Sequence, residues 1–335
     1  MKKESVTQKR IFQELEKLFR ESRLAAEVSG TLKIELDAAY RRIRGETALG
    51  LDEAVILCSR YGMSLDYIVG NEYNNLVFSY NPIEFENLDS YRLYIRQFTE
   101  TVLSLARRKN GEIFYTAEDV PLFHILRHRE LMFFNIFVWF NAVLGATLKF
   151  ERFVEEIDNK ESLYQDFNLL SDSYFNIASC EIWTEDTVRH LLRSLEYYCN
   201  MGVFQERNTV SLLFSQLNGM LATVRNWTET GKKDGKKDFK LYISATNLAN
   251  NYILLKNESQ TVVGIRLYTV KSIVTRHPAF CMETEKWIEN LMKKSTLLSG
   301  SSEMEREQFF QRTQREIDRR KEKCLEKFNG EDDSL

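Results

Sequence analysis

The sequence is poor in proline, cysteine and histidine: its 335 residues include 3 Pro, 5 Cys and 4 His. So few prolines leave long helices uninterrupted, because proline removes a backbone donor and clashes with the preceding turn. The cysteines are odd in number and widely scattered, and none forms a CxxC pair (Cys58, Cys180, Cys199, Cys281, Cys324). This pattern excludes a disulfide framework and favours reduced thiols in a cytosolic protein.

Signal-like and membrane-spanning segments are also scarce. The N-terminal sequence MKKESVTQKR has no apolar core, so no signal peptide is expected. The longest uncharged run, residues 131–148, is interrupted by Asn135, Asn141 and Gly145 and is closely flanked by charge. A membrane span needs about 20 predominantly apolar residues. We therefore expect a buried core helix here, with a spanning or interfacial helix as the alternative, in a cytoplasmic protein with no membrane partner.

Catalytic signatures are missing as well. The sequence contains no GxGxxG, GxxxxGK(S/T), GxSxG or HExxH motif. His124 and His128 have the spacing that puts two metal ligands on one helix face, but only Glu130 lies nearby as a third donor. We therefore expect no metal, no cofactor and no enzymatic activity.

The composition that is present is that of a folded protein. Hydrophobic residues make up 43% of the chain and aromatic residues 12%, enough for sizeable cores. The formal net charge is −3, but it is unevenly distributed. Residues 1–48 contain 11 Lys and Arg against 8 Asp and Glu, a net charge of +3, which leaves −6 for the remainder. A mildly basic head on an acidic body suits a DNA-binding domain attached to a second domain.

Three short helical patterns follow one another between Leu24 and Gly70. They cover residues 22–32, 35–44 and 52–61, and a further helix is expected before them at residues 7–19. Gly45 and Gly62 follow the second and third patterns at the position where a left-handed residue ends a helix. The glycines that separate the helical patterns predict a compact bundle of short helices.

The pattern at residues 35–44 has one apolar face, formed by Leu36, Ala39 and Ile43. The opposite face carries polar and basic side chains, and a helix fits the major groove of DNA, where arginine binds phosphate or guanine. We therefore predict DNA contacts from this helix and the turn before it (Lys33, Asp37, Ala38, Tyr40, Arg41, Arg42, Arg44). Tyr40 lies at the boundary between the two faces and is an alternative core residue.

The stretch AAYRRIRGE followed by LDEAVILCSRYGMSLDYIVG resembles the Cro/lambda-repressor type of helix-turn-helix, and more narrowly the BetR-like regulators. The resemblance covers about residues 7–72 and implies that residues 35–44 form the recognition helix. The sequence departs from the family at the turn, where Lys33 replaces a common glycine and Glu35 replaces the usual serine cap. The alternative interpretation is a small helical bundle whose arginines are only a solvated face.

The rest of the chain predicts a larger α+β domain. Strands are expected at residues 76–85 and 112–118 around a helix at 88–108. The pattern from residue 149 to 230 is almost entirely helical, with helices at 149–157, 162–177, 184–200 and 209–230. The lysine-rich segment 231–238 is expected to be a solvated loop, and the segments flanking ESQ at residues 258–260 predict a hairpin within a small sheet.

The C-terminal segment predicts a long helix that ends near Phe328. Ser302 and Glu305 have the spacing of a capping box, and a thin apolar stripe follows the helix (Phe310, Ile317, Cys324, Phe328). The stripe suits either a dimer contact or docking on the body. The fold class is therefore mainly α, with a helix-turn-helix domain at 1–74, an α+β regulatory domain at 75–300 and a C-terminal helix at 301–335.

The expected function is sequence-specific DNA binding in transcriptional regulation, controlled by the larger domain. The expected partners are double-stranded DNA and a second copy of the chain, because two recognition helices one helical turn apart gain affinity. A small-molecule effector is a further expectation if the larger domain is a sensor. The alternative is a protein-interaction scaffold or regulator whose helix-turn-helix does not bind DNA.

Overall fold

The computed structural model describes residues 6–19, 21–63, 65, 68, 76–80, 88–108, 110–144, 148–234, 236–248, 250–258, 260–267 and 271–328. The contacts divide the chain into two compact units, Met1–Phe78 and Ser79–Leu335, named unit 1 and unit 2 here. The boundary expected after residue 74 lies outside the described residues. The division by contacts comes four residues later.

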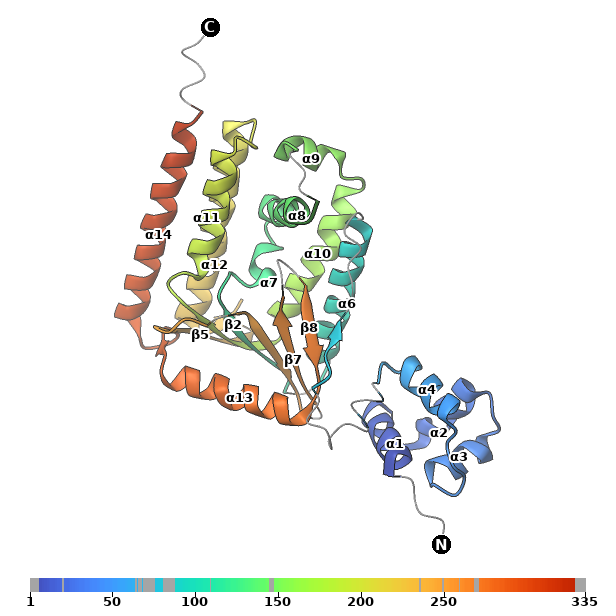
Figure 1. Ribbon diagram of the computed structural model, residues 1–335. Coiled ribbons are helices and arrows are strands. Elements are labelled where there is room, and N and C mark those ends of the chain that lie inside the picture. The colour runs from blue at the N-terminus through green and yellow to red at the C-terminus, as the bar shows by residue number, and fades with distance from the viewer. Residues whose placement is uncertain are drawn as a thin grey trace. The chain divides into compact units, whose positions relative to one another are not determined.

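Unit 1 is helical (Figure 1), and its described helices are α1 (Val6–Leu18), α2 (Glu21–Leu32), α3 (Leu36–Ile43) and α4 (Leu51–Arg60). Each of the four lies within one residue of its predicted bounds. Their inner faces form one core together with Ile68 (Ile11, Phe12, Leu15, Leu24, Val28, Ala39, Ala54, Leu57, Cys58, Ile68). The helical spacing of these apolar residues is what sets the packing faces.

The described residues of unit 2 form a nine-stranded mixed sheet in the order β1-β8-β7-β6-β2-β3-β5-β4, with β9 also paired to β5. The strands are β1 (Ser79–Tyr80), β2 (Glu112–Ala117), β3 (Ala178–Trp183), β4 (Lys232–Lys233), β5 (Lys237–Ile243), β6 (Tyr252–Lys256), β7 (Thr261–Arg266), β8 (Ser272–Thr275) and β9 (Thr296–Leu297). The prediction of a small sheet is therefore wrong. Four of the nine strands have only two to four residues, too short to leave a clear pattern.

The centre of the sheet is parallel. β2 pairs with β3, and β3 pairs with β5, each in parallel register. The chain makes each connection through helices, as parallel neighbours require. On the other side of β2, β6, β7 and β8 are antiparallel, and the predicted hairpin forms between β6 and β7.

Helices cover both faces of this sheet. They are α6 (Leu88–Ala106), α7 (Leu122–Ile125), α8 (Arg129–Leu144), α9 (Phe150–Glu156), α10 (Lys160–Phe175), α11 (Thr187–Asn200), α12 (Arg207–Thr230), α13 (Pro278–Lys293) and α14 (Glu303–Glu326). Figure 1 shows α13 on one face and the remaining helices on the other. Adjacent residues of β3 belong to different cores accordingly: Ile182 to the core with α13, and Trp183 to the larger one.

The four helices predicted between residues 149 and 230 form as α9 to α12, and β3 occupies the gap between the second and the third of them, where no strand was predicted. One prediction in this part of the chain is wrong. The lysine-rich segment is not simply a solvated loop, because it contributes β4 and the start of β5, and Lys233 is completely buried. The ammonium group of Lys233 donates to the carbonyl oxygens of Tyr174 and Ile177, both at 2.9 Å.

α8 is a buried core helix, as its uncharged sequence predicts. Most of its side chains are apolar, and those from Leu131 to Phe134 are all at most 2% exposed. Tyr91 of α6 stacks on Trp139 of α8 with a centroid separation of 4.8 Å. Among the described residues, no helix has the length and apolar content needed to cross a membrane.

α14 belongs to unit 2 and packs against α11 and α12. The predicted stripe lies in the core of the unit, with Phe310, Ile317 and Cys324 each at most 2% exposed. The stripe therefore docks on the body and is not free to form a dimer contact. The capping box is wrong, because the Ser302 side chain makes no cap hydrogen bond at the start of α14.

Candidate functional site

The turn between α2 and α3 holds the first predicted contact residue. Lys33 adopts φ +54°, the left-handed conformation that usually favours glycine, and its side chain is exposed. Ser29 fixes the turn: its hydroxyl donates to the Ile34 carbonyl oxygen at 2.7 Å, and its own carbonyl accepts from the Ile34 amide. Lys33 therefore adopts the backbone conformation that a glycine would take at this position, and its side chain lies at the surface.

α3 has defined ends. Glu35 precedes it in extended conformation without a side-chain cap bond, and Asp37 in the first turn complements the helix dipole. Gly45, at φ +76°, ends the helix. The amides of Gly45 and Glu46 then donate to the carbonyls of Arg42 and Arg41, the pair of bonds that satisfies a helix C-terminus.

The outer face of α3 presents Asp37, Tyr40, Arg41 and Arg44, which are all exposed, whereas Ala38 is half-buried. Tyr40 is 39% exposed and is therefore not the core residue that its boundary position allowed. The buried face is narrower than predicted. Ala39 is completely buried, but Leu36 is 47% exposed.

Arg42 differs from its neighbours. Its side chain is only 17% exposed, and its guanidinium binds Glu53 of α4 through two hydrogen bonds, of 2.8 and 3.0 Å. A third bond of 3.2 Å reaches the Ala38 carbonyl. The arginine holds the pKa of Glu53 below its ordinary value through the side-chain hydrogen bonds. The prediction that Arg42 points outward is wrong; the residue joins α3 to α4.

Gln8 of α1 holds the segment after α3 in place. Its side chain is only 6% exposed. Its amide nitrogen donates to the carbonyl oxygens of Arg42 and Thr47, at 2.7 and 2.9 Å, and its amide oxygen accepts from the Leu49 amide at 2.9 Å. α3 is thus fixed against the bundle at its C-terminal end, and its outer face is left to solvent.

The two exposed arginines of α3 are paired locally. Arg41 forms an ion pair with Asp37 one turn earlier, and Arg44 forms one with Glu46 at 2.7 Å. Both pairs are about half exposed, and exposed pairs of this kind contribute little to stability. A phosphate group would therefore replace either carboxylate at little cost.

The local charge balance limits the electrostatic field of unit 1. Residues 49–78 contain one basic residue, Arg60, and four acidic residues, so they cancel the charge of +3 on residues 1–48. The basic groups that remain at the surface of the turn and α3 are Lys33, Arg41 and Arg44.

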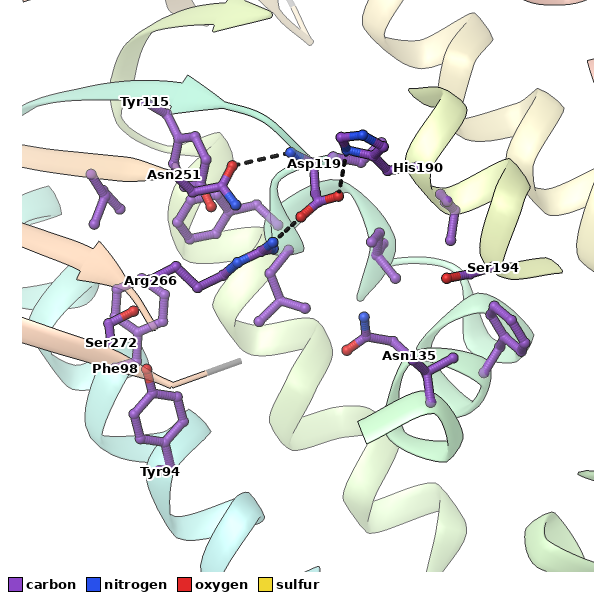
Figure 2. Close-up of a pocket in the computed structure, with 18 residues that line it drawn as sticks. Tyr94, Phe98, Tyr115, Asp119, Asn135, His190, Ser194, Asn251, Arg266 and Ser272 are labelled. Atoms are coloured by element: carbon purple, nitrogen blue, oxygen red, sulfur yellow. Dashed lines mark hydrogen bonds and ion pairs between the residues drawn. The ribbon is translucent and has the colours of Figure 1, made fainter. Parts of the chain in front are cut away.

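Unit 2 contains a cavity of about 200 Å³ between the sheet and the helices α6, α8 and α11. Most of the lining is apolar (Phe98, Val120, Leu122, Phe123, Ile125, Phe134, Val138, Leu191, Ile253). The polar lining comes mainly from Tyr94, Tyr115, Asp119, Asn135, His190, Ser194, Asn251, Arg266 and Ser272. Figure 2 shows Asp119, Asn251 and Arg266 together at the sheet, and Asn135 and Ser194 across from them.

Asp119 links the polar groups at the sheet. Its carboxylate forms an ion pair with Arg266 of β7 and lies 3.0 Å from Nδ1 of His190 of α11. Its backbone amide donates to the side-chain oxygen of Asn251 at 3.1 Å. Burial lowers the pKa of Arg266, and burial raises the pKa of Tyr115 to about 12. This wall of the cavity is a connected network of fixed side chains.

A second polar cluster lies in the core and is closed to solvent. Glu181 of β3 is 0% exposed and accepts hydrogen bonds from His124 at 2.8 Å, from Trp183 at 2.6 Å and from Tyr174. His124 is therefore a structural partner of a carboxylate. Among the described residues, no group of three or more His, Cys, Asp or Glu could hold a metal ion.

We compared the chain with protein-family models, curated proteins and solved structures. None of the three comparisons finds a match. The proposals on function therefore rest on the geometry of the two units.

The sequence patterns did not reveal the cavity. Its polar residues come from α6, β2, α8, α11, β7 and β8 and from the segments beside β2 and β6, so no local motif marks them. Asp119 and Asn251 follow or precede short strands, and that position was the only available signal. In unit 1, by contrast, the predicted residues all lie on one turn and one helix.

Proposed function

We propose that unit 1 is a helix-turn-helix domain of the Cro/lambda-repressor type that binds double-stranded DNA. In this proposal α3 lies in the major groove, and the protein is a sequence-specific transcriptional regulator whose activity unit 2 controls. The observation that supports it best is the outer face of α3: an exposed polar surface on a helix whose C-terminal end is fixed by Gln8 and Arg42.

The dimensions suit this role. An α-helix with its side chains is about 10–12 Å wide, and the major groove of DNA is about 12 Å wide. The first residues of α3, including Asp37, are exposed, as a helix that reads base edges from its N-terminal end requires. Asp37 can accept a hydrogen bond from cytosine, and Ala38 offers a methyl group to thymine.

The basic groups have distinct roles in the proposal. Lys33 and Arg44, at the two ends of α3, bind phosphates, and Arg41 binds a phosphate or a guanine edge. Tyr40 donates its hydroxyl to a phosphate. Arg42 does not contact DNA and instead positions α3 through Glu53.

We also propose that the protein binds DNA as a homodimer, since one short recognition helix contacts few base pairs. The apolar stripe of α14 does not supply this contact, because it is covered within unit 2. Half-sites one or more helical turns apart in a selected DNA sequence would support the dimer, and light scattering that finds only monomers with and without DNA would contradict it.

The decisive experiment is selection of binding sites from a pool of random oligonucleotides, using the full chain and an Arg41→Ala/Arg44→Ala variant. We expect the wild-type protein to enrich one sequence and the variant to lose that enrichment. Each lost phosphate contact should reduce the slope of log affinity against log salt by about 0.9. The matched control is Arg23→Ala, which removes another exposed arginine that pairs with a carboxylate at four residues' distance, on α2.

Equal loss of enrichment in the Arg23→Ala control would contradict the assignment of α3. No enrichment by folded wild-type protein, over a range of salt concentrations, would contradict the proposal as a whole.

A second candidate function is a protein-interaction module. It is favoured by the absence of net charge on unit 1 and by exposed apolar side chains on α3 and α4: Leu36, Leu51, Val55 and Ile56 are 47%, 77%, 44% and 47% exposed. Complexes held by such side chains depend weakly on salt. A steep loss of affinity with salt would therefore favour DNA, and a shallow one a protein partner.

A further inference from the structure

We propose that the cavity of unit 2 binds a small uncharged molecule, about the size of one substituted aromatic ring, through a carbonyl oxygen that accepts from Asn251. The proposal concerns unit 2 alone and stands whether or not unit 1 binds DNA. It is carried by the geometry of Asn251, by the size and lining of the cavity and by its charge balance.

Asn251 presents a donor that no described residue satisfies. The residue is 2% exposed, and no hydrogen-bond acceptor within the described part of the chain reaches its side-chain nitrogen. The amide cannot simply be turned over, because its oxygen accepts from the Asp119 backbone. Figure 2 shows the nitrogen turned away from Asp119 toward the side chains that line the cavity.

The backbone of Asn251 is also fixed. Its amide donates to the Asn250 side chain at 2.7 Å, and its carbonyl accepts from the Arg266 amide at 3.1 Å. A buried donor without an acceptor is unfavourable, so a rigid one marks a position where a bound oxygen atom gains affinity.

The size and lining favour an organic molecule over water. The cavity of about 200 Å³ is several times the roughly 30 Å³ that one water molecule occupies in the liquid. Water in such a site needs two to four polar partners, and the walls beyond the Asp119 network are mainly aromatic and aliphatic. A ring of six carbon atoms with one polar substituent fills the space and places its apolar surface against Phe98, Phe123 and Val138.

The charges favour an uncharged ligand. Arg266 is the cationic side chain that lines the cavity beside Asn251, and Asp119 already neutralises it. The same carboxylate also lies 3.0 Å from Nδ1 of His190, so Asp119 has a partner on either side without a charged ligand. A carboxylate on the ligand would compete with Asp119 for Arg266 and would lose its hydration in an apolar cavity.

The test is a titration of the full chain, followed by calorimetry and by protein NMR, with three probes of similar shape. Benzamide carries a neutral carbonyl, benzoate carries a charge, and ethylbenzene has no acceptor. We expect benzamide to bind with a Kd on the order of 1 mM or tighter, as suits so few atoms. Benzoate and ethylbenzene should each bind at least tenfold more weakly.

Two variants locate the site. Asn251→Asp keeps the oxygen that accepts from Asp119 and removes the free donor, so it should weaken benzamide binding at least tenfold. Ser194→Phe adds a ring from the opposite wall and should abolish the binding of all three probes. Retained near-ultraviolet dichroism and a cooperative thermal transition establish that each variant is folded, and an exposed substitution, Arg193→Ala on the same helix, should change nothing.

Benzamide affinity that is unchanged in Ser194→Phe would overturn the location of the site. Tighter binding of benzoate than of benzamide would overturn the inference that the ligand is uncharged, and equal binding of ethylbenzene would overturn the role of Asn251. The absence of binding by every probe to the folded wild-type chain would overturn the proposal. None of these results depends on DNA, so they fail or succeed separately from the function proposed for unit 1.

Discussion

The two units hold charged side chains at different depths. In unit 1, Arg42 and Glu53 remain 17% and 26% exposed, and the pairs of Arg41 and Arg44 are about half exposed. In unit 2, Glu181 and Lys233 are both completely buried. The difference in burial decides whether a charge is available to a partner or is committed to the fold.

Glu181 is stable as a buried carboxylate because its surroundings compensate it. Burial works to raise its pKa, but the neighbouring groups, His124 foremost, hold that pKa below its ordinary value. Burial also lowers the pKa of Lys233 well below its ordinary value, against the attraction of Glu181. No external ligand can reach Glu181 or Lys233, because both are buried. The carboxylates beside α3 are exposed, so an anionic ligand can take their place on the arginines.

The largest expected effect follows from Glu181→Gln. The variant leaves three donors, from His124, Tyr174 and Trp183, around a group that no longer carries charge. Breaking such a buried cluster costs about 3–5 kcal/mol. Urea unfolding followed by tryptophan fluorescence measures it, because all four tryptophans lie in unit 2.

The control for this prediction is Glu185→Gln, an exposed carboxylate two residues beyond β3. We expect it to change the stability of unit 2 by less than about 0.5 kcal/mol. Equal losses of unfolding free energy in the two variants would contradict the predicted difference between buried and exposed carboxylates.

The next effect separates two arginines on the same helix. Arg42→Ala should reduce the free energy of local opening of α3 and α4 by about 2 kcal/mol, because it removes two charge-assisted hydrogen bonds to Glu53. Arg41→Ala should reduce it by less than about 0.5 kcal/mol, since that pair is exposed. Native-state hydrogen exchange of the full chain measures both, and similar protection losses would refute the division of roles.

The smallest effect concerns pH. Burial, followed by repulsion from Arg127 and His124, lowers the pKa of His128 to about 4. The unfolded chain therefore binds a proton between pH 6.5 and 4 that the folded chain does not, and stability falls as the pH drops through that window. For one proton the loss cannot exceed about 1.4 kcal/mol per pH unit.

His128→Gln should flatten this part of the curve of unfolding free energy against pH. The measurement is urea unfolding of wild type and variant at pH 6.5 and 5.5, again by tryptophan fluorescence. A variant with the same loss of stability as the wild type would show that His128 does not cause it.

The sequence predicts well where the apolar pattern is long and continuous. The four helices of unit 1, the buried helix α8 and the β6–β7 hairpin all follow from spacing alone. β3 was not predicted because it has only six residues and one of them is Glu181, which no strand pattern places in a core. The burial of Lys233 was not predicted either. A lysine is buried only when acceptors from elsewhere in the chain bind its ammonium group, here backbone carbonyl groups, and local sequence does not reveal them.

At the candidate site too, the sequence predicts local features but not packing between elements. Position on the helix correctly placed Asp37 and Arg41 on the outer face of α3. It failed for Arg42 and Leu36, because their exposure depends on where α4 lies, and a periodicity argument contains no information on that packing. The cavity of unit 2 could not be predicted at all, because Asp119, Asn251 and Arg266 meet only through the sheet topology.

That topology has a consequence for how the chain is made. β2 lies in the middle of the sheet, where Tyr115 pairs with Glu181 on one side and with Ile253 on the other. β2 can pair with β6 only after most of the chain has been synthesised, and long-range strand pairing of this kind forms slowly. Unit 1 makes its contacts within the first 78 residues and can fold first. The apolar helix α8 therefore stays exposed for longer during synthesis than the core of unit 1, and exposed apolar surface of this kind promotes aggregation.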